Sequence, residues 1–315
     1  MPTFLKFLTA LRAVKDVPEN DGKGFSPLDL STWAVSALIE EAELTPKPAL
    51  VDRGRNGAHR DLDLAKLRRS ARALEDGFTA IAETAWEKAT SIRLREHVGS
   101  IGRAMERKMM DATDGSNAHR GAIWSVGLVV AAAAQRHPDG SAAGIAAAAG
   151  VLARLPDRFA PYPLSHGARA RFKFGVAGAR GEAQSGFPNV ILVGLPTLRS
   201  AREGGAPEDR ARLDALMALM SSVDDTCLLH RGGRAALEAA QEGARAVIAA
   251  GGTASRDGLH RLYRLDAKLM SLWASPGGSA DLLSVTLFLD SVERGTRALA
   301  GATKAAPAAT RACSR

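Results

Sequence analysis

The chain has 315 residues, 46% of them hydrophobic and 24% charged, which is ordinary for a globular protein with one large domain or two small ones. Its net charge of +8 suits polyanionic ligands, but no Lys/Arg-rich block with interleaved aromatics is present, so we expect no nucleic-acid partner. Cys227 and Cys313 form neither a disulfide framework nor a zinc pattern, and no apolar run is long enough to span a bilayer. We therefore expect a cytoplasmic protein with no membrane partner.

Hydrophobic periodicity predicts helices along most of the chain, with no strand ladder and no alternation of strands and helices. We expect an all-α fold of about ten helices, with its polar loops gathered at one end. Residues 1–28 are predicted to be an N-terminal extension, 29–300 one helical catalytic domain and 301–315 a disordered tail. The only candidate strand is Val190–Gly194, which is short.

The first helix is expected to end at Leu44, with Ser31 or Asp29 as its cap. Asp61 is the expected cap of the next helix, in which apolar residues from Leu67 to Ala85 keep a period of 3.6 and predict one continuous element. Further helices are expected over residues 94–109, 122–134, 141–154, from 207, over 233–250 and 258–274, and from the PGGSADLL motif to 299.

The segment Leu44–Asp63, LTPKPALVDRGRNGAHRDLD, is the most unusual stretch of the sequence. Pro46 and Pro48 exclude a helix there, while Gly54 and Gly57 permit tight turns. A rigid loop that carries acids, bases and histidines is typical of a site held between two helices. A solvated connection with ordinary surface charges is the alternative, and the segment alone leaves both open.

Five polar segments that combine glycine with charge interrupt the apolar helices: 45–63, 114–121, 178–188, 221–233 and 276–281. Glycine at a helix start leaves N–H groups and the positive end of the helix dipole free for phosphate. Basic side chains in these segments add charge-assisted hydrogen bonds, and Ser279 can donate beside the N–H groups of Gly277 and Gly278. The basic side chains that we expect to bind phosphate are those of Lys47, Arg120, Arg180 and Arg231.

The same segments carry acids that would repel phosphate unless a cation lies between them, namely Asp52, Glu182, Asp224, Asp225 and Asp281. Because Mg²⁺ takes one or two carboxylates together with phosphate oxygens, the combination favours a Mg-nucleoside triphosphate site. The alternative is that the aspartates only cap helices and that Glu182 pairs with Arg180. No P-loop, GxSxG or HExxH motif is present, so those enzyme classes are not indicated.

Five motifs taken in order resemble the triphosphoribosyl-dephospho-coenzyme A synthase family: LTPKPALVDRGRNGAHRDLD, NAHRGAIWSVGL, GARGEAQSGFP, DDTCLLHRGG and GGSADLL. The resemblance runs from about Ser31 to Asp290. The sequence departs from the family pattern at Ala49, where glycine is expected, at Ala118, where threonine is expected, and at Cys227, where asparagine is expected.

The resemblance implies an enzyme that joins ATP to 3′-dephospho-coenzyme A with release of adenine, and the Mg²⁺ expected from the acids above would accompany the ATP. Its product would be the prosthetic-group precursor for the acyl carrier protein of malonate decarboxylase or citrate lyase, and a carrier-protein transferase would be a further partner. The Ala/Arg-rich composition favours the malonate system. Two other functions stay open: a helical Mg-dependent nucleotide hydrolase and a non-catalytic module that binds the coenzyme or the carrier.

For this reaction we assign hypothetical roles to the candidate residues. Glu182 is the expected general base, and His59 or His119 is expected near the departing adenine. The phosphates are assigned to Lys47, Arg53, Arg120, Arg180, Arg231, Gly278 and Ser279, and the metal to Asp224, Asp225 and Asp281.

Overall fold

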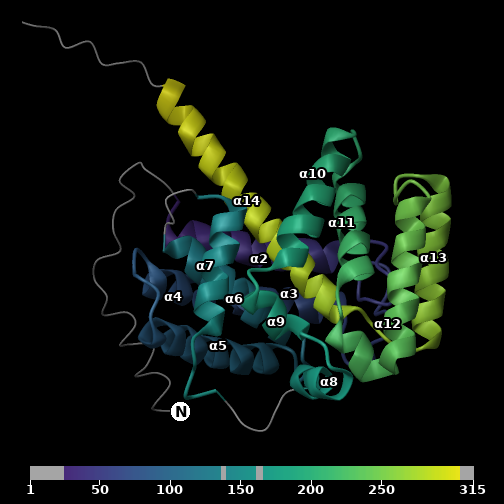
Figure 1. The fold of residues 1–315 in the computed structure, drawn as a ribbon, viewed down its shortest axis with the longest axis horizontal. Coiled ribbons are helices and arrows are strands. Elements are labelled where there is room, and N and C mark those ends of the chain that lie inside the picture. Colours follow the sequence, from purple (N-terminus) through teal and green to yellow (C-terminus); the bar gives the residue numbers. More distant parts are fainter. Residues whose placement is uncertain (1–24, 136–139, 161–165, 306–315) are drawn as a thin grey trace, which may run out of the picture.

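A computed structural model describes residues 25–135, 140–160 and 166–305, and all regular elements in these ranges are helices (Figure 1). The expected all-α domain is confirmed. In chain order the elements are α2 (Pro27–Glu43), α3 (Leu64–Ala73), α4 (Glu75–Ala85), α5 (Ile92–Ala112), α6 (Arg120–Ala134), α7 (Ala142–Arg154), α8 (His166–Phe174), α9 (Gly178–Gln184), the π-helical η1 (Val190–Gly194), α10 (Leu195–Glu203), α11 (Glu208–Ser222), α12 (Thr226–Ala249), α13 (Arg256–Ser271) and α14 (Gly277–Ala305).

The chain ends expected from the sequence fall mostly outside the described residues. Helix α2 begins at Pro27 and α14 runs to Ala305, so each expected domain edge lies inside a helix. The assignment of 1–28 as an extension and of 301–315 as a disordered tail stays a prediction.

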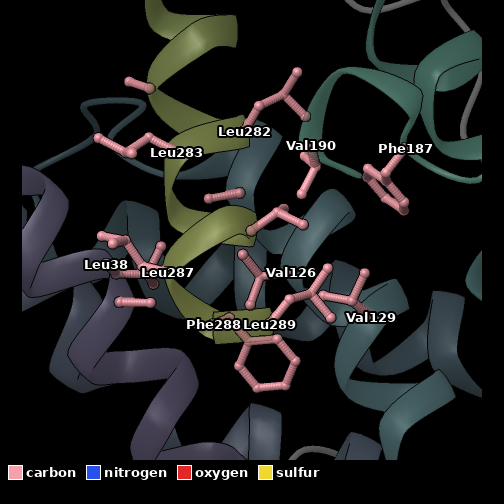
Figure 2. Close-up of a cluster of buried hydrophobic side chains, with 14 of the residues drawn as sticks. Leu38, Val126, Val129, Phe187, Val190, Leu282, Leu283, Leu287, Phe288 and Leu289 are labelled. Atoms are coloured by element: carbon pink, nitrogen blue, oxygen red, sulfur yellow. The ribbon is translucent and has the colours of Figure 1, made fainter. Parts of the chain in front are cut away.

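Helix α14 is the central element of the fold and crosses the middle of the molecule, with α2 and α4–α7 on one side and α10–α13 on the other (Figure 1). Every residue from Leu282 to Asp290 is buried, which is the pattern of a helix surrounded by others. Burial of each large apolar side chain contributes roughly 1.5–3 kcal/mol. Figure 2 shows this core, in which Leu282, Leu283, Leu287, Phe288 and Leu289 pack among Leu38, Val126, Val129, Phe187 and Val190.

The helix starts predicted from the sequence were displaced by a few residues. Ser26, not Ser31 or Asp29, caps α2: its hydroxyl accepts the N–H of Asp29, and the Asp29 carboxylate accepts the N–H of Ser26 in return. Asp63, not Asp61, caps α3 through a 2.7 Å bond from the N–H of Lys66. In each case the true cap lies within five residues of the expected one, because several residues near a helix start can cap it.

Two predicted elements were wrong in kind. The apolar stripe from Leu67 to Ala85 belongs to two helices, α3 and α4, which meet at Leu74, because a helical period can continue through a break in the backbone. Val190–Gly194 is π-helical and not a strand, since no strand in the described ranges pairs with it and it packs against α14 instead. A Cβ atom at Gly194 would lie 2.7 Å from Thr286 Oγ1, which shows how closely the two backbones approach.

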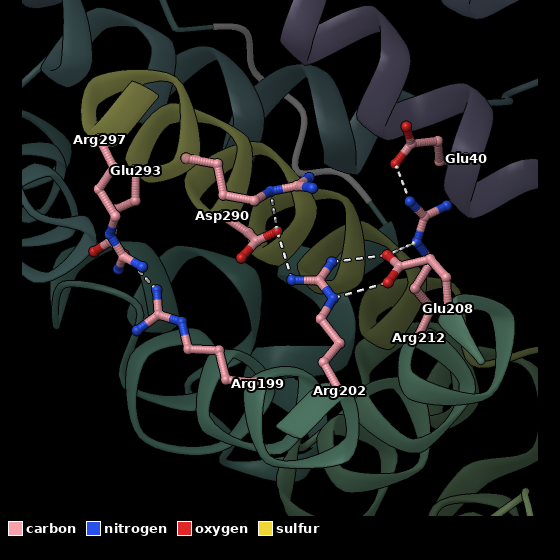
Figure 3. Close-up of polar contacts among 9 residues, drawn as sticks. Glu40, Arg199, Arg202, Glu208, Arg212, Asp290, Glu293 and Arg297 are labelled. Carbon is pink, nitrogen blue, oxygen red and sulfur yellow. Dashed lines mark hydrogen bonds and ion pairs between the residues drawn. The ribbon is translucent and has the colours of Figure 1, made fainter. Parts of the chain in front are cut away.

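An ion-pair network fastens α10 and α11 to α14 and α2 (Figure 3). Arg202 bonds both Glu208, at 2.7 Å, and Asp290 of α14, at 2.9 Å. Arg212 bonds Glu208 at 2.7 Å and reaches Glu40 of α2 at 3.0 Å. The carboxylates of Glu208 and Asp290 raise the pKa of Arg202 above its usual value, and Glu208 has the larger influence. The network fixes α11, and the residues that follow α11 enter the candidate site.

Candidate active site

Lys47 lies in the segment between α2 and α3, and only 1% of its surface is exposed. Its Nζ atom donates to the side chain and to the backbone carbonyl of Glu41 on α2, each at 2.6 Å. An ammonium group has three donors, so one remains for a ligand. Asp52 holds the loop itself by accepting the N–H groups of Lys47, Gly54 and Arg55. The segment is therefore a built, partly buried structure and not a solvated connection.

Asp266 of α13 also holds the loop between α2 and α3. It accepts the N–H of Ala49 at 2.9 Å and pairs with Arg55 at 2.6 Å. Ala49 has a φ of 55°, the left-handed region that favours glycine, which gives a physical reason for glycine being expected there. Gly57 has a φ of 54°, and a Cβ atom on it would lie 2.4 Å from the Ala49 carbonyl oxygen.

Glu41 and Asp266 belong to the site but were not predicted from the sequence. Glu41 occupies the buried stripe of α2, seven residues after Ala34 and three after Leu38. A carboxylate on an apolar stripe is a signal that it has a buried partner, so this residue could have been found from spacing alone. Asp266 lies far along the chain from the loop that it holds, and no comparable pattern marks it.

The N-termini of α6, α12 and α14 converge beside this loop, and two aspartates join them. Asp225 caps α12 by accepting the N–H groups of Cys227, at 2.8 Å, and Leu228, at 3.4 Å, with one oxygen. Its other oxygen accepts the N–H and the hydroxyl of Ser279 at the start of α14, at 2.8 and 3.0 Å. The positive ends of helix dipoles attract anions, so the convergence suits a phosphate chain.

Asp281 lies between the starts of α14 and α6. A Cβ atom on Gly121 would lie 1.8 Å from Asp281 Oδ2, so only glycine permits this approach of the two helices. Burial, followed by the charges of Glu41 and Asp225, raises the pKa of Asp281 well above its ordinary value, while a hydrogen bond from the Ala122 N–H opposes the rise. Burial therefore favours the protonated form of Asp281 as long as no cation lies beside it.

Two histidines border the convergence, and both have a pKa lowered to about 4. For His59 the causes are burial and then the charge of Arg231, whose guanidinium lies 3.3 Å from His59 Nδ1 and donates to the Ala58 carbonyl at 2.9 Å. For His119 the causes are burial and then the charge of Lys47. Both imidazoles are therefore neutral at neutral pH, and they serve better as hydrogen-bond partners than as strong acids.

The structure thus brings many of the predicted site residues around Lys47. The polar segments 45–63 and 114–121 also touch directly, because Ser116 donates to the Asp61 carbonyl at 2.9 Å. Residues of this group are Lys47, His59, His119, Asp225, Arg231, Gly278, Ser279 and Asp281. The N–H groups of Gly278 and Ser279 bond Asp225, so a phosphate would have to displace that carboxylate to reach them.

Four other predicted residues either pair with carboxylates outside this group or are exposed. Arg53 is largely exposed and pairs with Glu43 at 2.7 Å, and Arg120 pairs with Glu106 at 3.1 Å. Asp224 and Arg180 are exposed. The roles assigned to these four residues stay predictions, as do the roles of the residues around Lys47.

Glu182 lies on α9, in a polar segment that is helical over part of its length. Its two carboxylate oxygens accept the backbone N–H and the side-chain amide of Asn189, each at 2.8 Å. Helix α9 begins beside the start of α12, where a Cβ on Gly178 would lie 2.9 Å from a Thr226 methyl group. The pair between Glu182 and Arg180, which was the alternative to a site, is not among the contacts of the described residues.

The sequence model of the family described as ATP:dephospho-CoA triphosphoribosyl transferase matches residues 27–299. The chain belongs to this family. In this transferase the matched region begins at the first residue of α2 and ends within α14.

The chain is similar to curated proteins over most of its length. It is 53% identical over 277 residues to the 2-(5″-triphosphoribosyl)-3′-dephosphocoenzyme-A synthase of Klebsiella pneumoniae, with 86% of this chain and 99% of the relative covered. It is 52% identical over 274 residues to the probable synthase of Pseudomonas fluorescens, covering 87% and 94%, and 54% identical over 262 residues to that of Azotobacter vinelandii, covering 82% and 90%. No solved structure matches the chain.

The part of the transferase that the structure describes holds no helix long and apolar enough to cross a membrane. It also holds no group of three or more His, Cys, Asp or Glu side chains placed to bind a metal ion. Because both oxygens of Asp225 accept N–H or O–H groups, this residue is a poor metal ligand as it lies. Asp281, which accepts one backbone N–H, fits a site in which Mg²⁺ takes one carboxylate and completes its shell with phosphate oxygens.

Cys227 lies at the start of α12 in this transferase, where asparagine was expected. A Cβ atom on Gly277 would lie 3.1 Å from its sulfur, so the thiol packs against the first turn of α14. Burial and the charges of Asp225 and Asp281 raise the pKa of this thiol well above its usual value. The thiol is therefore protonated at neutral pH and is not an activated nucleophile.

Replacing Asp225 by Ala should lower the free energy of unfolding by about 2–4 kcal/mol, because it removes a helix cap and leaves buried N–H groups of α12 and α14 unpaired. Urea unfolding followed by circular dichroism measures the change. Asp224→Ala is the matched control, since its side chain is exposed and its loss should alter stability by less than about 0.5 kcal/mol. Equal destabilisation by both changes would contradict the bridging role of Asp225.

The transferase should lose stability as the pH falls from the histidine pKa of the unfolded chain towards that of folded His119. Folding lowers this pKa from 6.5 to about 4, so between these values the unfolded chain binds a proton that the folded chain does not. Stability is therefore fully present above the unfolded pKa, and a loss on the order of 3 kcal/mol accumulates below it. Urea unfolding between about pH 7 and about pH 4 should show a shallower loss for His119→Gln.

Proposed function

We propose that this chain transfers the triphosphoribosyl group of ATP to the ribose 2′-hydroxyl of 3′-dephospho-coenzyme A and releases adenine, at the site around Lys47. The observation that carries this assignment is the convergence of three helix N-termini on a buried lysine, in a chain of the triphosphoribosyl transferase family. The positive ends of the helix dipoles and the free donor of Lys47 favour a triphosphate, and the neighbouring carboxylates favour the proton transfers.

The reaction breaks the bond between the ribose C1 of ATP and N9 of adenine. It forms a bond from the same carbon to the 2′-oxygen of the coenzyme, and the triphosphate stays intact. The 2′-hydroxyl gives its proton to a base, and the departing adenine accepts a proton. By analogy with glycoside cleavage, the transition state resembles an oxocarbenium ion, which nearby carboxylates stabilise.

The remaining donor of Lys47 and the guanidinium of Arg231 are the best-placed groups for the phosphates. A bound Mg²⁺ would neutralise phosphate charge, and Asp281 is the residue of this chain suited to hold it. Glu182 is the candidate for the base, since burial raises the pKa of its carboxyl group.

The test is to incubate the purified protein with Mg-ATP and 3′-dephospho-coenzyme A and to analyse the mixture by mass spectrometry. Free adenine together with a coenzyme product enlarged by a triphosphoribosyl group supports the proposal, and adenine should require both substrates. Release of free ribose triphosphate or of phosphate would indicate a nucleotide hydrolase instead. Tight binding of both substrates without turnover would indicate a binding module.

We further propose that the protein acts in the cytoplasm. Its product would serve as prosthetic-group precursor for the acyl carrier protein of malonate decarboxylase or citrate lyase, after attachment by a separate carrier-protein transferase. Composition favours the malonate system. Incubation of the product with each carrier and its transferase would distinguish the two.

A further inference from the structure

His119 has one ring nitrogen paired and one free. Its Nδ1 atom lies 2.7 Å from the hydroxyl oxygen of Ser70 on α3, while Nε2 is buried and has no hydrogen-bond partner among the described residues. The residue is only 4% exposed, and Ser70 is completely buried. His119 is the N-cap residue of α6, whose start lies at the candidate site, and the charge of Lys47 acts on the ring. A buried, unpaired polar atom next to a ligand site calls for a partner from the ligand.

The pairing of Ser70 decides which nitrogen of His119 carries the hydrogen. The Ser70 hydroxyl has no other hydrogen-bond partner in the described ranges. If Nδ1 carried the hydrogen and donated it, the buried hydroxyl hydrogen of Ser70 would be left unpaired as well as Nε2. If Ser70 donates to Nδ1, only the Nε2–H is left. Since each unpaired buried group costs about 1–3 kcal/mol, the second arrangement is favoured.

We propose that Ser70 is a positioning residue that holds His119 in the Nε2–H form, so that this N–H donates a hydrogen bond to an acceptor atom of ATP. The inference rests on the proposed function for the identity of the ligand, but the tautomer is a property of the protein alone. Burial, and after it the charge of Lys47, keeps the ring neutral. A neutral imidazole is then a donor whose direction is fixed before the substrate arrives.

The acceptor is a ring nitrogen of adenine or a phosphate oxygen, both of which accept an N–H. Adenine gains negative charge as its glycosidic bond breaks, so a hydrogen bond to it strengthens in the transition state and raises kcat. A bond to phosphate is made equally before and during the reaction, and its loss raises KM instead.

The test uses ¹⁵N NMR of the whole protein with labelled histidine, with His119→Gln to identify the His119 signals. The ligand-free protein should show His119 as the Nε2–H tautomer, and Ser70→Ala should shift it towards a mixture. Addition of adenine or of inorganic tripolyphosphate should perturb Nε2, and the probe that does so identifies the acceptor. Ser31→Ala is the control, since this buried hydroxyl donates to the Leu28 carbonyl and touches no histidine.

Turnover supplies a second readout. Ser70→Ala should lower kcat or raise the KM for ATP roughly tenfold, the kinetic equivalent of one hydrogen bond. An Nδ1–H tautomer in the wild type, or no response of Nε2 to either probe, would overturn the proposal. Since the tautomer is read without substrates, this outcome is distinguishable from absence of the proposed transfer.

Discussion

Lys47→Met is expected to lower the free energy of unfolding by about 3–5 kcal/mol, because it leaves the carboxylate of Glu41 buried without its partner. Turnover should fall by roughly 10²–10³ or more, since the variant also lacks the positive charge proposed to bind phosphate. Unfolding in urea and the release of adenine from ATP measure the two effects separately. One substitution should affect both stability and turnover because Lys47 and Glu41 form a buried ion pair within the candidate site.

Two further variants separate stability from function. The double change Lys47→Met with Glu41→Leu removes both buried charges and should recover most of the lost stability, but not the turnover. Arg53→Met is the matched control, because Arg53 pairs with Glu43 at the surface and such pairs contribute at most about 1 kcal/mol. If the double variant regained turnover, Lys47 would have no part in binding the substrate.

Glu182→Gln is expected to reduce kcat by roughly 10²–10⁴ if this carboxylate takes the proton of the 2′-hydroxyl. Burial raises the pKa of Glu182 above 4.5, and the hydrogen bonds from Asn189 and Val190 oppose the rise. A base acts only when ionised, so turnover should decline as the pH falls through this raised pKa, above the range of an exposed glutamate. A pH–rate profile of the wild type supplies the test.

Asn189→Ala distinguishes a catalytic from an anchoring role for Glu182. It removes the amide that bonds one carboxylate oxygen but leaves the carboxylate in place. The variant should keep substantial turnover, with its acidic limb moved to higher pH, because the lost bond favoured the ionised form. Equal loss of turnover in Glu182→Gln and Asn189→Ala would mean that the carboxylate only fastens α9 to the turn after it.

The fold class could be predicted from the sequence because apolar periodicity reports which side of each segment is buried. The period does not report where the backbone breaks, so α3 and α4 were predicted as one helix. The composition of Val190–Gly194 suggested a strand, but a strand needs a partner, and whether one exists is a property of the whole fold.

The candidate site could be predicted in part, because glycine next to charge at a helix start is visible in the sequence. Which carboxylate faces inward is not visible: Asp224 and Asp225 are neighbours, yet one is exposed and the other joins two helices. The partner of Asp225 is Ser279, far along the chain, and only the packing of α12 against α14 brings them together. Ser70 was missed for the same reason, since its partner lies on another element.

Helix α12 is interrupted at Gly233, whose φ of 65° and ψ of −160° lie in a region that essentially only glycine adopts. The turns before it are held by the site, through the Asp225 cap and the bonds of Arg231, while the longer part after it packs against α11 and α13. Helix α12 therefore consists of two helical segments that meet at a kink. Since Asp266 of α13 also bonds the loop of Lys47, the outer pair α12–α13 is tied to the site by a second connection besides this kink.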